Sequence, residues 1–236
     1  CRSAISWIDG ENGRLLYRGI PIETLAENKV SFVETAMLLI TGRLPTPAER
    51  NDFSELLARN SALHRNMDLH FNAFPPNSHP MAIMSAMINA MSTHDRPKIT
   101  DEDSAIRNSA KLMSRVRTIA AASYKASVGE PAIYPRMDLK YVENFMHMMF
   151  GKKEDKETVD ALAMLFVLHA DHEQNCSAST VRMVGSSEAD LFQSITAGIG
   201  ALSGPLHGGA NSAVLEMLET IQSTGDTAES FMDKVK

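Results

Sequence analysis

From residue 32 onward, apolar residues recur at three- and four-residue spacing, and this periodicity is the feature that most constrains the fold. Start and stop signals bound several segments. Thr46-Pro47-Ala48-Glu49 has the pattern of a capping box with proline at the first helical position, and Gly42 is a suitable C-terminal stop for the preceding segment. We expect helices at 32–41, 47 to about 62, 79–93, 101 to about 127, 138–150, 157–173 and 188–202, with further helical runs from Val214 and over 228–236.

Residues 3–17 depart from this pattern. Two short runs of strand-forming residues, Ala4–Ile8 and Arg14–Tyr17, flank the turn-forming segment Asp9–Gly13. The sequence therefore predicts an all-α fold with a small N-terminal β-hairpin. The 15 methionines, many of them on apolar helical stripes, are expected to fill the core.

Composition excludes several classes of function. The 236 residues carry a net charge of −6 without a cluster of Lys or Arg, which argues against nucleic acid or an anionic membrane as a partner. Two cysteines are too few for a disulfide framework, and no signal peptide or membrane-length apolar run is visible, so we expect a cytoplasmic protein. The chain starts without Met and stops inside a helical pattern, so we expect a piece of a longer protein.

One histidine stands in a turn of proline and glycine, within Gly204-Pro205-Leu206-His207-Gly208-Gly209. An amphipathic run follows from Val214, so His207 is expected at or just before a helix N-terminus. The helix dipole there disfavours imidazolium, and a neutral imidazole can donate a hydrogen bond to a substrate carbonyl. The alternative is a histidine that only caps the turn.

A second cluster of polar residues follows the apolar run 162–167. His169 and His172 are spaced to share one helix face, and four more polar residues crowd the expected helix end: Asp171, Glu173, Asn175 and Ser177. Burying so many polar groups is costly unless they contact each other or a ligand. A metal site is the competing interpretation, but the zinc motif His-Glu-x-x-His has a wider spacing and no third ligand lies nearby.

These motifs, LHADHEQNCSASTVR at 168–182 and GPLHGGAN at 204–211, resemble citrate synthase of the bacterial type, as does SAISWIDGENGRLLYRGIPIETLAE at 3–27. The resemblance extends across the chain through SHPMAIM at 78–84, Tyr124-Lys125 and NFMHMMF at 144–150. It implies a large helical domain over 1–208 and the beginning of a small, substrate-closing domain over 209–236. It also implies a homodimer or hexamer.

The reaction implied by the resemblance is the condensation of acetyl-CoA with oxaloacetate and water to give citrate and CoA. Acetyl-CoA is a substrate here, and neither a cofactor nor a metal is implied. His207 would be catalytic, donating to the thioester carbonyl where enolate charge develops. His172 and Asn175 would bind oxaloacetate, and the Ser177 hydroxyl would orient the catalytic histidine.

Two other histidines are expected to have structural roles: His169 packs against the helix end and His79 starts a helix. His172 and His207 are expected to face one cavity.

Parts of the family pattern are not matched. The second catalytic histidine, in a GHRVY segment, the aspartate base and the carboxylate-binding arginines all lie beyond Lys236, so the chain alone is expected to be inactive. Arg59-Asn60-Ser61-Ala62 and Gly151–Glu154 also differ from the cluster that binds NADH in regulated relatives.

Three alternatives stay open. The first is 2-methylcitrate synthase, which uses propionyl-CoA and shares these motifs. A binding site distinguishes two acyl groups that differ by one methylene by only about 1–3 kcal/mol. A di-histidine metal hydrolase is more remote. The third is a non-catalytic helical interaction protein. The cluster of polar residues at 169–177 argues against it.

Overall fold

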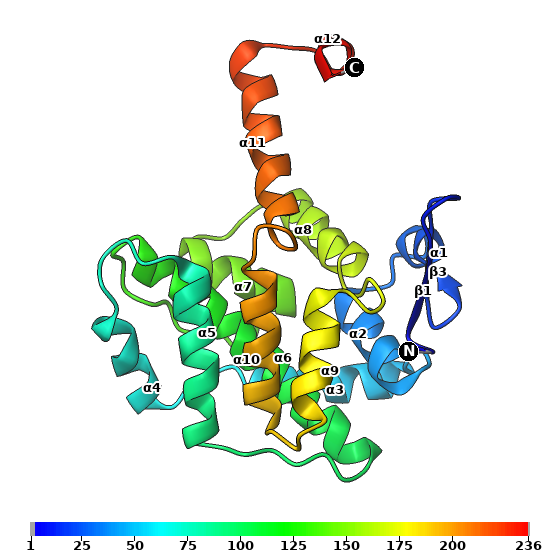
Figure 1. Ribbon diagram of the computed structural model, residues 1–236. Helices are drawn as coiled ribbons and strands as arrows, with labels where there is room; N and C mark the ends of the chain where they lie inside the picture. Colours follow the sequence, from blue (N-terminus) through cyan, green and yellow to red (C-terminus); the bar gives the residue numbers. More distant parts are fainter. Residues whose placement is uncertain (1–2, 236) are drawn as a thin grey trace.

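The computed structural model describes residues 3–235, which are mostly helical (Figure 1). This confirms the expected all-α class with a small N-terminal hairpin. The helices are α1 (Ile22–Glu27), α2 (Phe32–Thr41), α3 (Pro47–Arg59), α4 (Arg65–His70), α5 (Pro80–Ala90), α6 (Glu102–Ser127), α7 (Tyr141–Phe150), α8 (Lys156–Leu168), α9 (Cys176–Gly185), α10 (Leu191–Leu202), α11 (Gly209–Thr224) and α12 (Ala228–Val235), with 3-10 turns η1 (Phe71–Ala73) and η2 (Met91–Thr93).

The hairpin lies at one edge of the molecule (Figure 1). Strand β1 (Ser6–Asp9) pairs antiparallel with β2 (Arg14–Tyr17), and the short β3 (Ile20–Pro21) extends the sheet. In this register Ser6 stands directly opposite Tyr17. Both residues are buried, so the hairpin is packed against the helical body through this pair.

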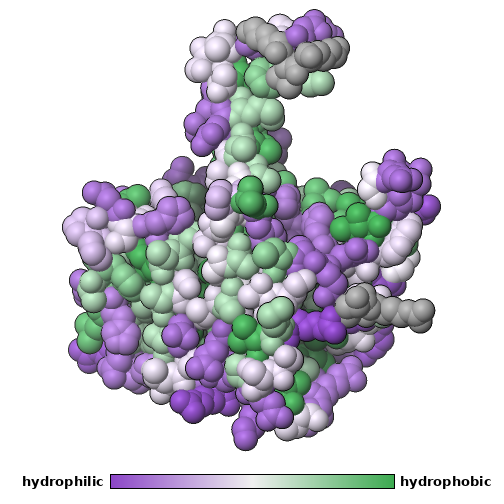
Figure 2. All heavy atoms as spheres, viewed as in Figure 1, coloured by the Kyte–Doolittle hydropathy of each residue, from purple (hydrophilic) through white to green (hydrophobic). Residues whose placement is uncertain are grey.

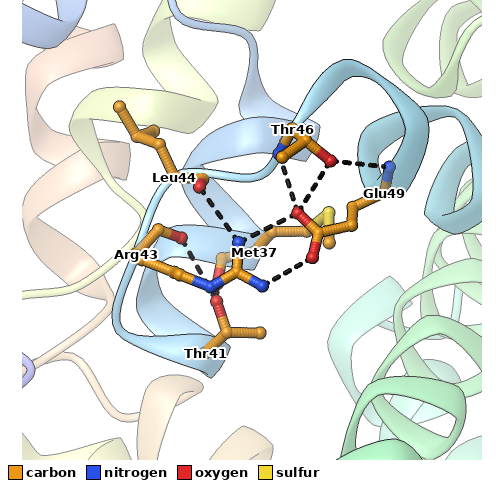
Figure 3. A network of polar contacts seen from close by, with 6 residues as sticks. All are labelled: Met37, Thr41, Arg43, Leu44, Thr46 and Glu49. Carbon is orange, nitrogen blue, oxygen red and sulfur yellow. Dashed lines mark hydrogen bonds and ion pairs between the residues drawn. The ribbon is translucent and has the colours of Figure 1, made fainter.

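Local capping signals fix the starts of two early helices. Ser31 and Glu34 form a complete capping box at α2, and Thr46 and Glu49 form one at α3. Figure 3 shows the second: the Glu49 carboxylate accepts from the Thr46 backbone at 2.8 Å and from both terminal nitrogens of Arg43. These bonds, chiefly the one from Arg43, lower the pKa of Glu49 to about 2, so the carboxylate stays charged at neutral pH.

The core consists of three apolar clusters, two of which share the long helix α6. Ile119 and Ala122 of α6 pack with residues of α5 and α10, while Ala110 of α6 packs with α2 and α3. The third cluster joins Tyr17 of the hairpin to α1, α2 and Val167 of α8. Methionines are prominent in these clusters, as expected: Met37, Met67, Met87 and Met91 are all buried.

Helices α9 and α10 lie side by side in an antiparallel pair (Figure 1). Gly198 of α10 is the point of closest approach, because a Cβ built there would lie 2.5 Å from Val181 Cγ2 and 3.4 Å from the Ser177 carbonyl oxygen of α9. The pair therefore depends on a residue without a side chain. The first turn of α9 and the last turn of α10 consequently lie at the same end of the pair.

Helix α11 extends away from the body, and α12 follows at its far end (Figures 1 and 2). None of the α11 residues is buried, and several of its large apolar side chains are exposed: Val214, Leu215, Met217 and Leu218. The predicted domain boundary at 208/209 falls at the start of this helix and stays a prediction. Among the described residues, no helix has the length and apolarity that a membrane span requires.

Some sequence expectations were wrong. The helix expected over 157–173 ends at Leu168, so His169 and His172 do not share a helix face. A continued helix would bond the Asp171 amide to the Val167 carbonyl, but the Tyr17 hydroxyl accepts from that amide and donates to that carbonyl instead. Helix α9 was not expected, because its sequence is rich in Ser, Thr and Cys, which have only moderate helix propensity. The short helices α1 and α4 were not expected either.

We predict that Gly198→Ala destabilises the fold by about 1–3 kcal/mol, because its new methyl group overpacks the contact with α9. Gly200→Ala is the matched control in the same helix, since its Cβ would meet nothing within 4 Å. It should be stabilising by roughly 0.5–1 kcal/mol through the loss of helical glycine. Urea denaturation followed by far-ultraviolet circular dichroism measures both, and equal effects would contradict the packing argument.

Candidate functional site

The two histidine-bearing motifs meet through a hydrogen bond. Ser177 Oγ lies 2.7 Å from His207 Nε2, although the two residues are 30 positions apart in the chain. Ser177 lies in the first turn of α9, and His207 follows the end of α10, so the antiparallel pair brings them together. Both side chains are half-buried.

His207 is held by the turn that contains it. The amides of His207 and Gly208 both donate to the Gly204 carbonyl oxygen at 3.0 Å, and α11 starts at Gly209. His207 thus lies directly before a helix N-terminus, as its sequence context predicted. A Cβ at Gly208 would lie 2.0 Å from the Leu202 carbonyl oxygen, so glycine is required there by close backbone approach.

This arrangement determines what the imidazole can do. A neutral imidazole that accepts the Ser177 hydroxyl at Nε2 carries its own proton on Nδ1. The Nδ1–H group is then a hydrogen-bond donor, and the residue that carries it lies directly before the N-terminus of α11. A neutral donor of this kind can polarise a carbonyl oxygen on which negative charge develops.

The second motif forms the loop 169–175 between α8 and α9. His172 is exposed, and its ring centroid lies 6.3 Å from that of His169. His169 ends α8, with Nδ1 2.8 Å from the Leu165 carbonyl oxygen. The loop runs directly into the helix that presents Ser177. That His172 and His207 face one cavity stays a prediction.

Asn175 has a structural contact of its own. Its side-chain oxygen accepts from the Ala178 amide at 2.9 Å and caps α9, which leaves the side-chain NH₂ as the group available to a ligand. His79 likewise caps α5, accepting from the Met81 amide at 3.2 Å, which confirms the expected helix-start position.

Five residues in and around the loop were not assigned a contact from sequence. Asp171 and Glu173, which were expected to crowd a helix end, bond instead to Ser6, Ile8 and Tyr17 of the hairpin. The partners lie more than 150 positions away, so spacing gives no signal for them. Burial raises the pKa of the Tyr17 phenol, and its hydroxyl therefore keeps the proton it donates.

No metal arrangement emerges around the histidines. Within residues 3–235, His, Cys, Asp and Glu side chains form no group of three that could hold an ion. A cavity of about 1240 Å³ lies between α2, α3, α7 and α8, and its lining includes neither His172 nor His207. The candidate site is therefore defined by the loop 169–175, the start of α9 and the turn before α11.

We predict that Gly208→Ala disrupts the Ser177–His207 contact, because the new methyl group must displace backbone. Gly209→Ala is the adjacent control, since its Cβ would only make ordinary contact with Pro205 at 3.7 Å. In NMR spectra of histidine-labelled protein, the His207 ring signals should shift in the first variant alone. An unshifted His207 in Gly208→Ala would show that the turn tolerates a side chain.

Comparison with known proteins places the chain among similar sequences. The family model "Citrate synthase, C-terminal domain" matches residues 1–236. Citrate synthase 1 of Mycobacterium tuberculosis is 48% identical over 242 residues, covering 100% of this chain and 56% of the relative. Citrate synthase of Corynebacterium glutamicum is 47% identical, covering 99% and 55%. The chain thus spans little more than half the length of these curated relatives.

Solved structures show the same fold. Citrate synthase from Thermotoga maritima matches with a TM-score of 0.80 and 37% identity, over 94% of this chain and 58% of that one. The Thermoplasma acidophilum enzyme, solved as a ternary complex with carboxymethyl coenzyme A and oxaloacetate, matches with a TM-score of 0.88 and 28% identity over the same shares. Family model, curated relatives and structures agree, and this chain belongs to the citrate synthase family.

Proposed function

We propose that this chain contributes part of the active site to a citrate synthase, which condenses acetyl-CoA with oxaloacetate and water to give citrate and CoA. The observation that carries the proposal is the 2.7 Å contact between Ser177 and His207 at the start of α11. It is supported by relatives that bear the citrate synthase name across the whole of this chain.

The proposed catalytic residue is His207. Removing a proton from the acetyl methyl group places negative charge on the thioester oxygen, and a preorganised donor there stabilises the enolate. Nδ1–H of a neutral His207 is that donor. Ser177 acts through His207 by fixing the ring orientation and the tautomer from Nε2.

The proposed oxaloacetate-binding residues are His172 and Asn175. His172 is exposed in the loop before α9, and the Asn175 amide nitrogen is free of the capping bond that its oxygen makes. Both groups can donate to carboxylate or carbonyl oxygens. A neighbouring structure holds oxaloacetate in its own complex, which supports a ligand of this class.

The general base and the carboxylate-binding arginines are proposed to come from sequence outside these 236 residues, since the relatives are nearly twice as long. On this basis the chain alone would not turn over. Residues 209–236 would begin the small domain, whose further helices would cover the exposed apolar side chains of α11. The complete protein is proposed to be cytoplasmic and a homodimer or hexamer, with no cofactor.

Acyl specificity decides between citrate synthase and 2-methylcitrate synthase. We expect the protein at its relatives' length to have a higher kcat/KM with acetyl-CoA than with propionyl-CoA, because the relatives it matches are named citrate synthases. Release of CoA measured with each thioester, at saturating oxaloacetate, tests this. A preference for propionyl-CoA would assign the protein to 2-methylcitrate formation.

We predict that His207→Ala in the same longer protein lowers kcat by about 10²–10³, roughly 3–4 kcal/mol, with little change in substrate affinity. The hydrogen bond strengthens only as enolate charge develops, so its loss raises the barrier selectively. His172→Ala should instead raise KM for oxaloacetate, because that residue contacts the bound substrate.

Steady-state kinetics separates these signatures, with Ser203→Ala as a control whose exposed hydroxyl bonds only the Gly200 carbonyl oxygen of its own helix. Near-normal turnover in His207→Ala would show that this histidine only caps its turn.

A further inference from the structure

We infer that the N-terminal hairpin is a positioning device for His172, in which Ser6 and Tyr17 hold the backbone amides of the two residues that flank that histidine. The inference deepens the proposed function, because it rests on His172 as an oxaloacetate-binding residue. Ser6 and Tyr17 are thus positioning residues, which act through the loop 169–175 and touch no reacting atom.

Tyr17 holds the peptide that joins Ala170 to Asp171, the residue before His172. Its hydroxyl accepts from the Asp171 amide at 3.3 Å and lies 3.0 Å and 3.2 Å from the carbonyl oxygens of Val167 and Leu168, which share its single proton. The side chain has no exposed surface. This one hydroxyl therefore contacts three backbone groups at the point where α8 ends.

Ser6 holds the peptide after His172. Its hydroxyl donates to the Asp171 carboxylate and accepts from the Glu173 amide at 3.1 Å. The Glu173 carboxylate in turn accepts from the Ile8 amide at 2.7 Å. The hairpin thus binds both neighbours of His172 through backbone and side chain, while the histidine ring itself is left exposed.

Both hydroxyls come from one cross-strand pair. Ser6 and Tyr17 stand opposite each other in the β1–β2 register, so their separation is fixed by the sheet. A slip of one residue would turn both side chains to the other face and break both contacts. The hairpin therefore presents two hydroxyls at a set spacing to a loop that has no regular structure of its own.

The loop needs such a constraint. Glu173 has a φ of +55°, a left-handed conformation that residues other than glycine disfavour and that persists where the surroundings over-determine it. The three bonds that Ser6 and Ile8 make to Asp171 and Glu173 supply those surroundings. Without them, the loop would relax and His172 would lose its fixed place beside α9.

A hairpin that only stabilised the fold would predict something different. Removing a hydroxyl would then lower the free energy of unfolding without changing His172 in the folded protein. The discriminating measurement is thus the state of His172 and its two neighbouring amides, and it can be made on this 236-residue chain.

The experiment compares Ser6→Ala with Ser6→Thr, which keeps the hydroxyl, and Tyr17→Phe. Ser92→Ala is the matched control, because Ser92 is as buried as Ser6, at 7% exposure, and also donates to a carboxylate, that of Asp190. Amide hydrogen exchange is followed at Asp171 and Glu173, and the His172 ring signals are followed by NMR of histidine-labelled protein, with His172→Gln for assignment.

We expect Ser6→Ala to speed exchange of the Glu173 amide at least tenfold and Tyr17→Phe to do the same at Asp171. Both should shift or broaden the His172 ring signals and leave those of His207 in place. Ser6→Thr and Ser92→Ala should resemble the parent. Unchanged exchange and an unchanged His172 in folded Ser6→Ala would overturn the inference; if that variant does not fold, Tyr17→Phe against Ser6→Thr gives the same decision.

Kinetics of the longer protein separates this inference from the proposed function. If the hairpin positions His172 for oxaloacetate, Ser6→Ala raises KM for oxaloacetate about fivefold or more, while kcat changes less and Ser92→Ala has no effect. A displaced His172 with an unchanged KM would support the positioning role and reject substrate binding by His172. An unchanged His172 would reject the positioning role whatever KM does.

Discussion

The site depends on the close approach of α9 and α10 at Gly198. Because no side chain stands there, the two helices pack closely enough for the first turn of one to reach the turn that follows the other. The result is the 2.7 Å contact between Ser177 and His207. A methyl group at Gly198 would push on Val181 and on the Ser177 carbonyl, so packing and site geometry are set by one contact.

Hydroxyl groups organise the irregular parts of the structure around that helix pair. The Tyr17 hydroxyl donates to the Val167 carbonyl at the end of α8, and the Ser6 hydroxyl accepts from the Glu173 amide in the loop that follows. The Ser177 hydroxyl is hydrogen-bonded to the His207 ring. The Tyr17 and Ser6 hydroxyls each donate and accept at the same time, so a single group can tie two segments together. The loop 169–175 is thereby tied to buried residues of the hairpin.

The residues proposed for substrate binding and for carbonyl polarisation lie on separate elements. His172 and Asn175 lie on the loop and cap that precede α9, and His207 lies before α11, which extends from the body (Figure 1). An apolar helix without buried residues is suited to packing against further structure, in keeping with relatives that are nearly twice as long.

The sequence by itself determined the helical class, the N-terminal hairpin, the capping box at Thr46 and the place of His207 before a helix, because these depend on residues within about one helical turn of each other. The resemblance to a family supplied the pairing of Ser177 with a histidine. Only the tertiary structure decided that α8 stops at Leu168, that Ser, Thr and Cys at 176–180 are helical, and that Asp171 and Glu173 bond to the hairpin. The end of α8 and the bonds of Asp171 and Glu173 depend on partners 150 or more positions away, and α9 packs against α10. Local spacing carries no information about which distant hydroxyl will compete for a backbone bond.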